Sequence, residues 1–108
     1  MSYKIIQPLS LTDGIGLNQV RNEIDTVLNE GVKTILLDLQ DVTFINSSAI
    51  GALVAMHKAV HGRSGKLSIC SMRKQVSLVL KLSRMDQIFD IFTDKEEFQQ
   101  KNEAPIIS

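Results

Sequence analysis

Three polar residues in a row, Asn46, Ser47 and Ser48, stand where a strand-like segment gives way to a helix-like one. Asn and Ser are preferred at helix N-caps because their side-chain oxygens accept hydrogen bonds from the first free backbone N–H groups. A helix N-terminus also carries roughly half a positive charge, so a phosphate on a serine hydroxyl would be tolerated there. The pattern therefore predicts either a place where a serine can be phosphorylated or a simple helix cap.

No catalytic base accompanies these serines. A serine hydrolase would show a Gly-x-Ser-x-Gly elbow, and none surrounds Ser47. The first histidine follows along the same predicted helix about 15 Å away at about 1.5 Å per residue, too far for direct proton transfer. The Gly-Ile-Gly sequence at 14–16 lacks the third glycine and the lysine of a phosphate-binding loop. We therefore expect Ser47 to be a residue that another protein modifies rather than a catalytic residue. We expect the chain to be no enzyme and to bind no cofactor.

The histidines and the cysteine do not form a metal-binding pattern. His57 and His61 lie four residues apart, a spacing compatible with two zinc ligands on one helix. No third ligand lies nearby in the sequence, and Cys70 is the only cysteine. We therefore expect no metal site, and we expect both histidines on the exposed part of the helix beside Lys58. Cys70 should be a small buried hydrophobe, without an internal disulfide.

The segments on both sides of the serines must position them. Residues 35–39 are apolar on successive positions except for Asp38, which is typical of a strand covered on both faces. From Ala49 to Val60 the apolar residues, Ala59 among them, fall on most of the helix circumference. We therefore predict a largely buried helix that starts at Asn46 and presents its N-terminus at the surface.

The rest of the chain alternates strand-like and helix-like segments. The patterns predict strands at 3–7, at 66–70 and within 85–92, and helices at 17–29, at 74–83 and after residues 93–94. The first apolar pattern extends past Pro8 to Leu9, Leu11 and Ile15. The helix at 74–83 has the apolar stripe Val76, Val79, Leu80 and Leu82. From about residue 101 there is no periodicity, so we expect a disordered tail.

This alternation predicts an α/β fold, a small mixed and mostly parallel sheet of about four strands with about four helices packed on it. In such sheets functional sites gather at the carboxyl ends of the strands. Residues 46–48 follow one such end and residues 70–73 the next, so Met72 and Arg73 join the candidate site. At 108 residues the chain should form one domain that spans 1–108.

Composition argues against several classes of function. The 12 basic and 12 acidic residues cancel, unlike in a protein whose main task is to bind nucleic acid or an anionic membrane. The first residues do not resemble a signal peptide, and no run of about eighteen apolar residues could span a membrane, so we expect a cytoplasmic protein. One asymmetry is local, because residues 58–84 include seven basic and no acidic residues. That run is either solvated surface or a docking surface for an acidic partner.

The 17 residues DLQDVTFINSSAIGALV resemble the signature of the STAS domain of anti-sigma factor antagonists. In that signature an aspartate-ended apolar strand and a short loop precede Asp-Ser-Ser or Asp-Ser-Thr, which is followed by Gly, an aliphatic residue and Gly. The likeness runs from Ile5 to Phe98 and implies the STAS-like fold. This chain departs from the pattern at Asn46, where the family usually has Asp, and at Ala49, where it usually has the first Gly.

The resemblance implies a phosphorylation site and a partner-binding surface around it. In the family a partner anti-sigma factor that is also a kinase phosphorylates the first serine after the aspartate. By position that serine is Ser47, with Ser48 the second choice. Asp13 matches an aspartate that lies near the phosphorylation site in the family, although its place before two glycines also suits a turn or helix cap. The implied partner-binding residues are Asp13, Asn46, Ser47, Ser48, Ala49, Met72 and Arg73.

By this resemblance the chain is a protein-binding module that sequesters a kinase-type anti-sigma factor while Ser47 is unphosphorylated. The implied partners are that anti-sigma factor and serine kinase and a serine phosphatase, with no nucleic acid and no membrane. The chain itself is expected as a monomer or weak dimer. The alternative is a STAS scaffold or accessory subunit, for example of a lipid-transport ATPase or a signalling complex, that acts without phosphorylation. The departures at Asn46 and Ala49 favour this alternative.

Overall fold

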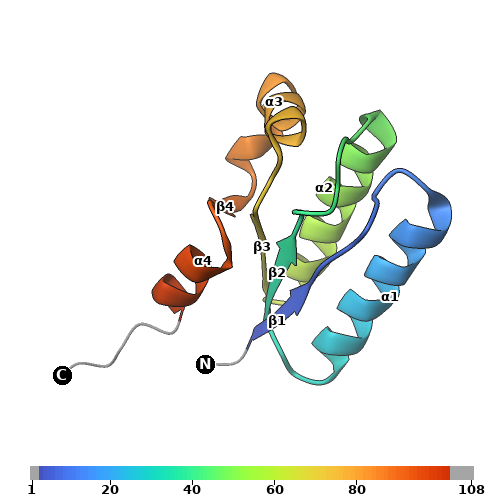
Figure 1. The fold of residues 1–108 in the computed structure, drawn as a ribbon. Coiled ribbons are helices and arrows are strands. Elements are labelled where there is room, and N and C mark those ends of the chain that lie inside the picture. Colours follow the sequence, from blue (N-terminus) through green and yellow to red (C-terminus); the bar gives the residue numbers. More distant parts are fainter. Residues whose placement is uncertain (1–2, 103–108) are drawn as a thin grey trace.

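Four parallel strands form the central sheet of the structure, a computed structural model that describes residues 3–102 (Figure 1). The strands are β1 (Tyr3–Ile6), β2 (Thr34–Asp38), β3 (Lys66–Cys70) and β4 (Asp90–Phe92). They lie side by side in sequence order, and every pairing is parallel. The predicted α/β fold with about four strands is therefore confirmed, and the described sheet is parallel throughout.

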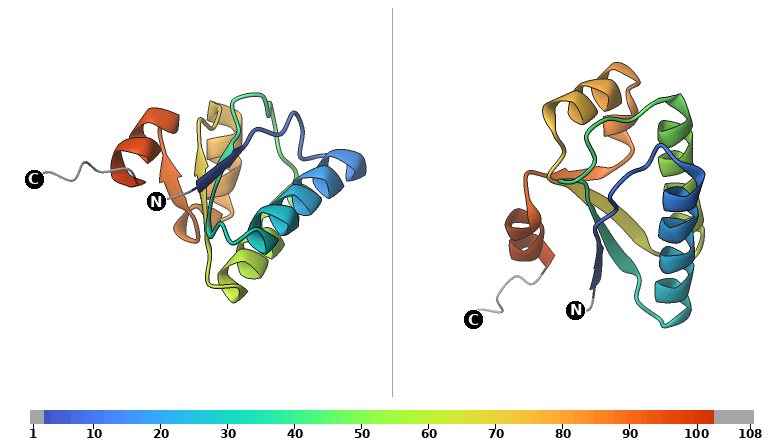
Figure 2. Two further views of the ribbon diagram at one scale, coloured as in Figure 1. Left: turned by 90° about the horizontal axis from the view of Figure 1, so that it is seen from below. Right: turned by 45° about the vertical axis from the view of Figure 1, so that its right-hand side comes forward.

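Helices cover both faces of this sheet. They are α1 (Gly14–Asn29), α2 (Ser47–Gly62), α3 (Lys74–Leu82) and α4 (Lys95–Asn102), with a short 3₁₀ helix, η1 (Met85–Gln87), before β4. Helices α1 and α2 pack side by side on one face, and α4 lies on the opposite face (Figure 2). Helix α3 contributes Val76 and Leu80 to the same core as α1 and α2. Because each of α1, α2 and α3 follows the carboxyl end of a strand, all three begin at the same edge of the sheet.

Strand β2 is enclosed from both sides. Ile35 and Leu37 belong to the large core beneath α1 and α2, whereas Leu36 joins Cys70 and Phe98 in a smaller cluster beneath α4. All five side chains are fully buried. Burying one aliphatic or aromatic side chain typically contributes about 1.5–3 kcal/mol of folding free energy. The buried side chains of each layer therefore contribute several kcal/mol, roughly, to keeping this strand in place. The prediction of a strand covered on both faces is confirmed.

Helix α1 begins at Gly14, before the predicted start at Leu17. Asp13 caps it, because its Oδ1 accepts a hydrogen bond of 2.6 Å from the backbone N–H of Gly16. A Cβ atom on Gly16 would lie 3.0 Å from the carbonyl oxygen of Ser10, so glycine permits the close approach of this loop. The early start was missed because two glycines in the first turn interrupt the apolar periodicity.

The strand predicted within residues 85–92 is shorter than expected. After α3, Arg84 adopts a left-handed backbone conformation with φ of 62°, and the chain forms η1 before β4 begins at Asp90. Between them Phe89 turns into the main core and is buried. A left-handed turn at a residue other than glycine leaves no mark in an apolar pattern. The predicted strand IFDIF, residues 88–92, is therefore shortened to its last three residues, Asp90–Phe92.

Several apolar residues predicted to extend the core are exposed instead. Leu9, Ile15 and Leu82 are 79%, 75% and 75% exposed. In α3 only Val76 and Leu80 are buried, because this nine-residue helix meets the core along one narrow stripe. Periodicity shows that a helix has an apolar side, but the number of neighbours available to cover that side depends on the tertiary fold.

Helix α2 is buried on one side only, which corrects the prediction of a largely buried helix. Ala49, Leu53 and Met56 face the core. Gly51, Ala55 and Ala59 are exposed along the other side. Alanine suits either environment, so its presence among apolar residues did not distinguish the two sides.

The tail predicted to be disordered from about residue 101 lies largely outside the described residues. Residues 101 and 102 belong to α4, and 103–108 are not described. None of the helices in the described part of the chain is long and apolar enough to cross a membrane.

Replacing Leu53 tests how tightly α2 is packed on the sheet. Leu53 is fully buried in the main core, so Leu53→Ala should lower the free energy of unfolding by about 2–5 kcal/mol. Lys58→Ala, on the exposed side of the same helix, is the control and should be nearly silent. Urea denaturation followed by circular dichroism measures both. Equal and small losses would show that α2 does not pack on the sheet as described.

Candidate functional site

Three loops meet at the carboxyl edge of the sheet, where α1, α2 and α3 begin. They span residues 7–13, 39–46 and 71–73. The side-chain amide of Gln7 donates a hydrogen bond of 2.8 Å to Asp41 Oδ2. Arg73 Nε donates a hydrogen bond of 2.8 Å to the carbonyl oxygen of Gln40. These bonds tie the first and third loops to the middle one, so the edge is a connected surface rather than three independent loops.

The start of α2 is capped by Asn46. This residue has an extended backbone, and its Oδ1 accepts a hydrogen bond of 2.9 Å from the N–H of Ala49. Its carbonyl oxygen accepts the first helical hydrogen bond, from Ile50 at 3.0 Å. The predicted cap at Asn46 is therefore confirmed. The N–H groups of Ser47 and Ser48 precede that first bond, so the helix itself offers them no acceptor.

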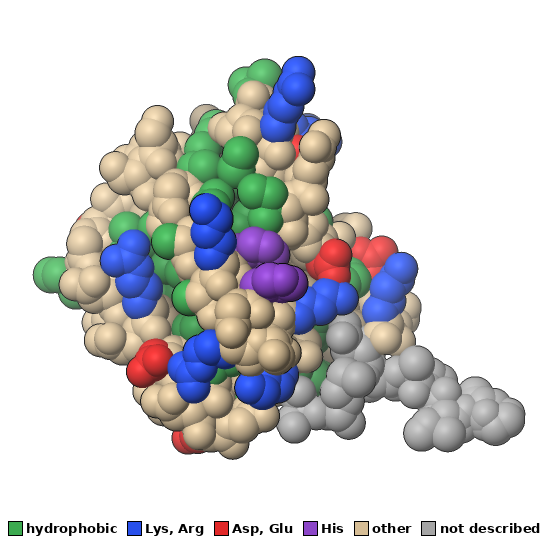
Figure 3. Space-filling view, turned by 180° about the vertical axis from the view of Figure 1, so that it is seen from behind, with side chains coloured by type: hydrophobic (Ala, Val, Ile, Leu, Met, Phe, Trp, Pro, Cys, Tyr) green, Lys and Arg blue, Asp and Glu red, His purple; other side chains and the backbone are tan. Residues whose placement is uncertain are grey.

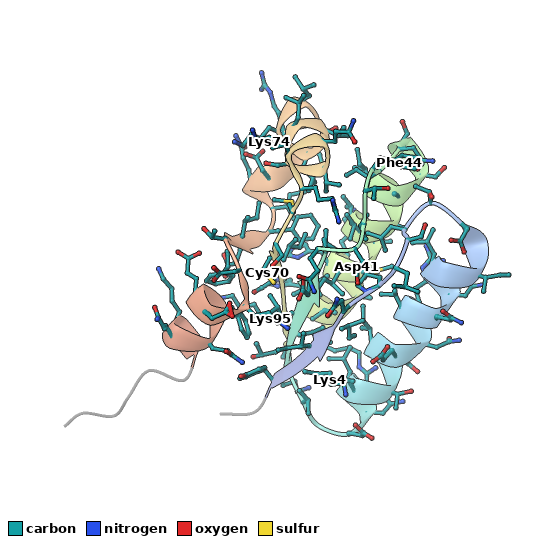
Figure 4. All side chains as sticks on the ribbon, viewed as in Figure 1. Lys4, Asp41, Phe44, Cys70, Lys74 and Lys95 are labelled. Carbon is teal, nitrogen blue, oxygen red and sulfur yellow. The ribbon has the colours of Figure 1, made fainter. Side chains whose placement is uncertain are left out.

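Ser47 and Ser48 are exposed, and neither hydroxyl makes a hydrogen bond within residues 3–102. Because Asn46 supplies the cap, the serines are not needed for it. Phe44 lies beside the start of α2 and is 54% exposed (Figure 4). The two exposed hydroxyls lie at the positive end of a helix dipole, where negative charge is favoured.

The other predicted site residues differ in solvent exposure. Asp13 and Arg73 are exposed at the carboxyl edge. Asp13 is the N-cap of α1, as the helix-cap interpretation had it, and its carboxylate lies at the same edge as the start of α2. Met72 is half-buried against the main core. Ala49 is fully buried, so its methyl group cannot contact a partner, and it affects the site only through its N–H bond to the cap.

An apolar rim at this edge was not predicted from the sequence. We define the edge rim as Leu9, Ile15 and Phe44, which are 79%, 75% and 54% exposed. They come from the first loop, the first turn of α1 and the middle loop. Leu9 and Ile15 border a hollow of about 400 Å³ that Asp13 also lines. Exposed apolar side chains that gather in one region mark interaction sites. The available signal was that two of the three, Leu9 and Phe44, lie in loops outside the regular elements.

Asp38, the one charge in β2, is buried beneath this edge. Its Oδ1 accepts a hydrogen bond of 3.1 Å from the N–H of Gln40. Its Oδ2 lies 3.7 Å from Lys95 Nζ and has no hydrogen-bond partner among the described residues. A buried carboxylate is costly unless it is paired. The pair with Lys95 joins the start of α4 to the end of β2, on the face of the sheet opposite α2.

Cys70 is opposite Asp38 in the register of β2 and β3 and lies close to Lys95 (Figure 4). Burial of the thiol raises its pKa to about 11, and the negative charge of Asp38 acts in the same direction. The thiol is therefore protonated at neutral pH, and reactivity requires the thiolate. The prediction of a small buried hydrophobe is confirmed.

The two histidines lie next to each other on the surface of α2 (Figure 3), but only His61 is exposed. His57 is half-buried, with its ring edge-on to Phe89 at 5.3 Å and its Nδ1 enclosed. His61 is exposed and stacks on it at 6.0 Å. The predicted exposure of His57 is wrong because the distant Phe89 folds over α2. Among residues 3–102 no group of three or more His, Cys, Asp and Glu could hold a metal ion.

Comparison with known proteins places the chain in a family. The STAS domain pattern matches residues 12–98, which is most of the chain. A Thermotoga maritima protein named as a candidate anti-sigma factor antagonist is 31% identical over 77 residues, 71% of this chain and 68% of the relative. A Thermotoga neapolitana homolog is 35% identical over 68 residues, 63% of this chain and 60% of the relative. The matched segment thus spans less than two thirds of that second protein.

Solved structures share the fold. The crystal structure of a candidate anti-sigma factor antagonist from Thermotoga maritima matches with a TM-score of 0.78 and 26% identity, over 90% of this chain and 84% of that chain. The anti-sigma factor antagonist SpoIIAA in its unphosphorylated form matches with a TM-score of 0.74 and 19% identity, over 100% of this chain and 94% of that chain. The chain belongs to the STAS domain family, and its resemblance to the anti-sigma factor antagonists of that family is confirmed.

Replacing Asn46 separates the cap from the charge of the residue that provides it. Asn46→Ala should cost about 0.5–2 kcal/mol of stability because the N–H of Ala49 loses its acceptor. Asn46→Asp should change stability by only a few tenths of a kcal/mol, roughly, since Asn and Asp cap about equally well. Denaturant titrations of both variants test this. A loss of several kcal/mol in Asn46→Asp would show that Asn46 has a structural role other than capping.

Proposed function

We propose that this chain is an anti-sigma factor antagonist that binds a kinase-type anti-sigma factor while Ser47 is unphosphorylated and releases it once Ser47 is phosphorylated. The observation that carries this proposal is the start of α2. Ser47 is exposed there, and Asn46 provides the cap, so Ser47 is free to change its charge. A Paenibacillus polymyxa relative named as an anti-sigma F factor antagonist supports it, with 23% identity over 79 residues, 72% of this chain and 68% of the relative.

In the unphosphorylated state the carboxyl edge offers a partner both apolar and polar groups. The edge rim supplies apolar area that a partner can cover. Asp13, Ser47, Ser48 and Arg73 supply exposed polar groups around it. The bonds from Gln7 and Arg73 already hold the three loops together, so less conformational freedom is lost on binding. We propose that Met72, half-buried beside Arg73, completes this surface.

In the phosphorylation step this chain supplies only the accepting hydroxyl. The Ser47 Oγ attacks the γ-phosphorus of ATP held by the kinase, the bond from that phosphorus to ADP breaks, and the hydroxyl proton passes to a base of the kinase. A serine phosphatase reverses the modification when water attacks the phosphoserine phosphorus and inorganic phosphate leaves. In both reactions the chain is the substrate and the partner is the catalyst.

Phosphorylation has opposite consequences for the fold and for the interface. The phosphate adds a charge of about −1.5 to −2. Within the chain it meets the positive end of the α2 dipole and the free N–H groups of Ser47 and Ser48, so the fold tolerates it. Neutral Asn46 places no carboxylate directly before it in the sequence. At an interface the same charge must lose its water, which is unfavourable unless the partner provides matched donors. Affinity therefore falls while stability does not.

Asn46 and Ala49 favour a second candidate function, a STAS scaffold or accessory subunit. The family usually has Asp at the first position and Gly at the second. In this case the carboxyl edge would hold its partner, a transport ATPase or a signalling complex, without any modification of Ser47. The two functions predict the same surface but differ in whether charge on Ser47 controls binding.

Substitutions at Ser47 separate the two candidates. Ser47→Asp should leave the thermal midpoint unchanged or slightly raised because negative charge is favoured at a helix N-terminus. It should weaken binding to the cognate anti-sigma kinase by about 1–3 kcal/mol. Ser47→Ala should keep binding and lose phosphorylation, whereas Ser48→Ala should retain both, to a reduced extent. Thermal melts, titration calorimetry and phosphopeptide mapping measure these effects.

The matched comparison is between Ser47→Asp and Ser48→Asp, which add the same charge to adjacent residues of the same helix turn. If Ser47→Asp binds the kinase as tightly as the wild type, charge on Ser47 does not control binding and the scaffold is the better description. If Ser48→Asp alone weakens binding, the controlling residue is the second serine. If Ser47→Asp unfolds the domain, the claim that Ser47 has no structural role is wrong.

A further inference from the structure

The outer side of α3 is both apolar and basic. Leu78 and Leu82 are 57% and 75% exposed and lie one turn apart. Lys74 and Lys81 are exposed on the same side of the helix, at positions three or four residues from the leucines. We define these four residues as the basic patch, and three of them line a hollow of about 450 Å³. Residues 58–84 contain no Asp or Glu, so α3 itself carries no acidic side chain that compensates the charge of the basic patch.

The loop before α1 and one side of that helix as far as Glu23 carry the opposite combination. Leu9 and Ile15 are 79% and 75% exposed, and Asp13 and Glu23 are exposed beside them. These four residues, the acidic patch, all line the hollow of about 400 Å³ described above. Residues 7–30 contain four acidic residues and one basic residue. The acidic patch therefore matches the basic patch in apolar content and opposes it in charge.

We propose that copies of this chain associate head to tail, with the basic patch of one copy on the acidic patch of the next. Each patch offers two exposed aliphatic side chains and two charged ones, next to hollows of similar volume. The formal net charge of zero means that no long-range repulsion keeps two copies apart. Association covers four exposed aliphatic side chains per contact, and exposed apolar clusters of this kind mark interaction surfaces.

The two patches of one molecule lie on separate elements. Helix α3 and the start of α1 lie on opposite sides of the start of α2 (Figure 1). Hydrophobic side chains stand out at the edge formed by the start of α1 and again, beside a basic one, at the end formed by α3 (Figure 3). A contact between two different patches leaves one patch of each kind open at the ends of the assembly until the assembly closes into a ring. Association therefore grows with concentration and does not stop at a dimer.

Self-association and partner binding compete for the same surface. The acidic patch shares Leu9 and Ile15 with the edge rim. A copy bound there covers part of the surface that the anti-sigma factor would use. This competition rests on the proposed function, whereas the head-to-tail contact does not, because it can be measured with the purified chain alone.

Sedimentation velocity with complementary blocked variants tests the contact. Wild-type chain should sediment faster as its concentration rises at low ionic strength and return to a monomer in high salt. Leu82→Glu blocks the basic patch and Ile15→Lys blocks the acidic patch, so each variant alone should be a monomer. An equimolar mixture retains one working patch of each kind and should give a dimer and nothing larger. Lys58→Glu, outside both patches, is the control and should assemble like the wild type.

Circular dichroism melts establish that each variant is folded, and the pair Leu78→Glu and Leu9→Lys gives the same readout through different residues. A wild-type chain that stays monomeric at every concentration overturns the proposal. An equimolar mixture of the two blocked variants that stays monomeric also overturns it. A dimer that persists in Leu82→Glu alone or in Ile15→Lys alone overturns it as well, because such a dimer joins two identical patches. Monomeric wild type that binds phosphatidylglycerol vesicles, while Leu82→Glu does not, also overturns it and assigns the basic patch to an anionic membrane surface.

Discussion

The burial of β2 between two apolar layers is the constraint on which the rest of the structure depends. Ile35 and Leu37 fill one layer and Leu36 fills the other, and all three are fully buried. A shift of one residue would move every one of these side chains to the wrong face, so the register of β2 against its neighbours is strongly specified. The point at which the chain leaves the sheet is thereby determined, and the start of α2 is determined with it.

At that point two polar residues take up different environments. Asp38 ends the strand, fully buried, and is paired with Lys95 across the sheet from α2. Asn46 begins the helix, exposed, and satisfies the N–H of Ala49. The pair of Asp38 with Lys95 stabilises the strand end, and Asn46 caps the helix start. Neither interaction involves Ser47 or Ser48. A site whose residues carry no structural duty can change its charge while the fold persists, which is the physical basis of the proposed switch.

The alternation of strands and helices could be predicted because most elements have a periodic or continuous apolar run, and α4 could be predicted from the helix-cap signal at residues 93–94. The cap at Asn46 could also be predicted, because capping is an interaction between residues close together in the sequence. What could not be predicted depends on neighbours distant in the sequence. The exposure of Leu82 reflects how little of α3 meets the core, and the burial of His57 reflects a contact with Phe89. The edge rim and the hydrogen bond from Arg73 to Gln40 likewise form only when separate loops meet.

We propose that the start of α2 carries a charged group without a change in the fold. Amide hydrogen exchange on chain carrying phosphoserine at position 47, compared with unmodified chain, tests this most directly because it needs no partner. We predict equal protection in β2 and in the buried side of α2 around Leu53, with changes confined to residues 39–46 and the first turn of α2. Loss of protection along the whole of α2 or in β2 would contradict it, because the charge would then act on the core rather than on the surface.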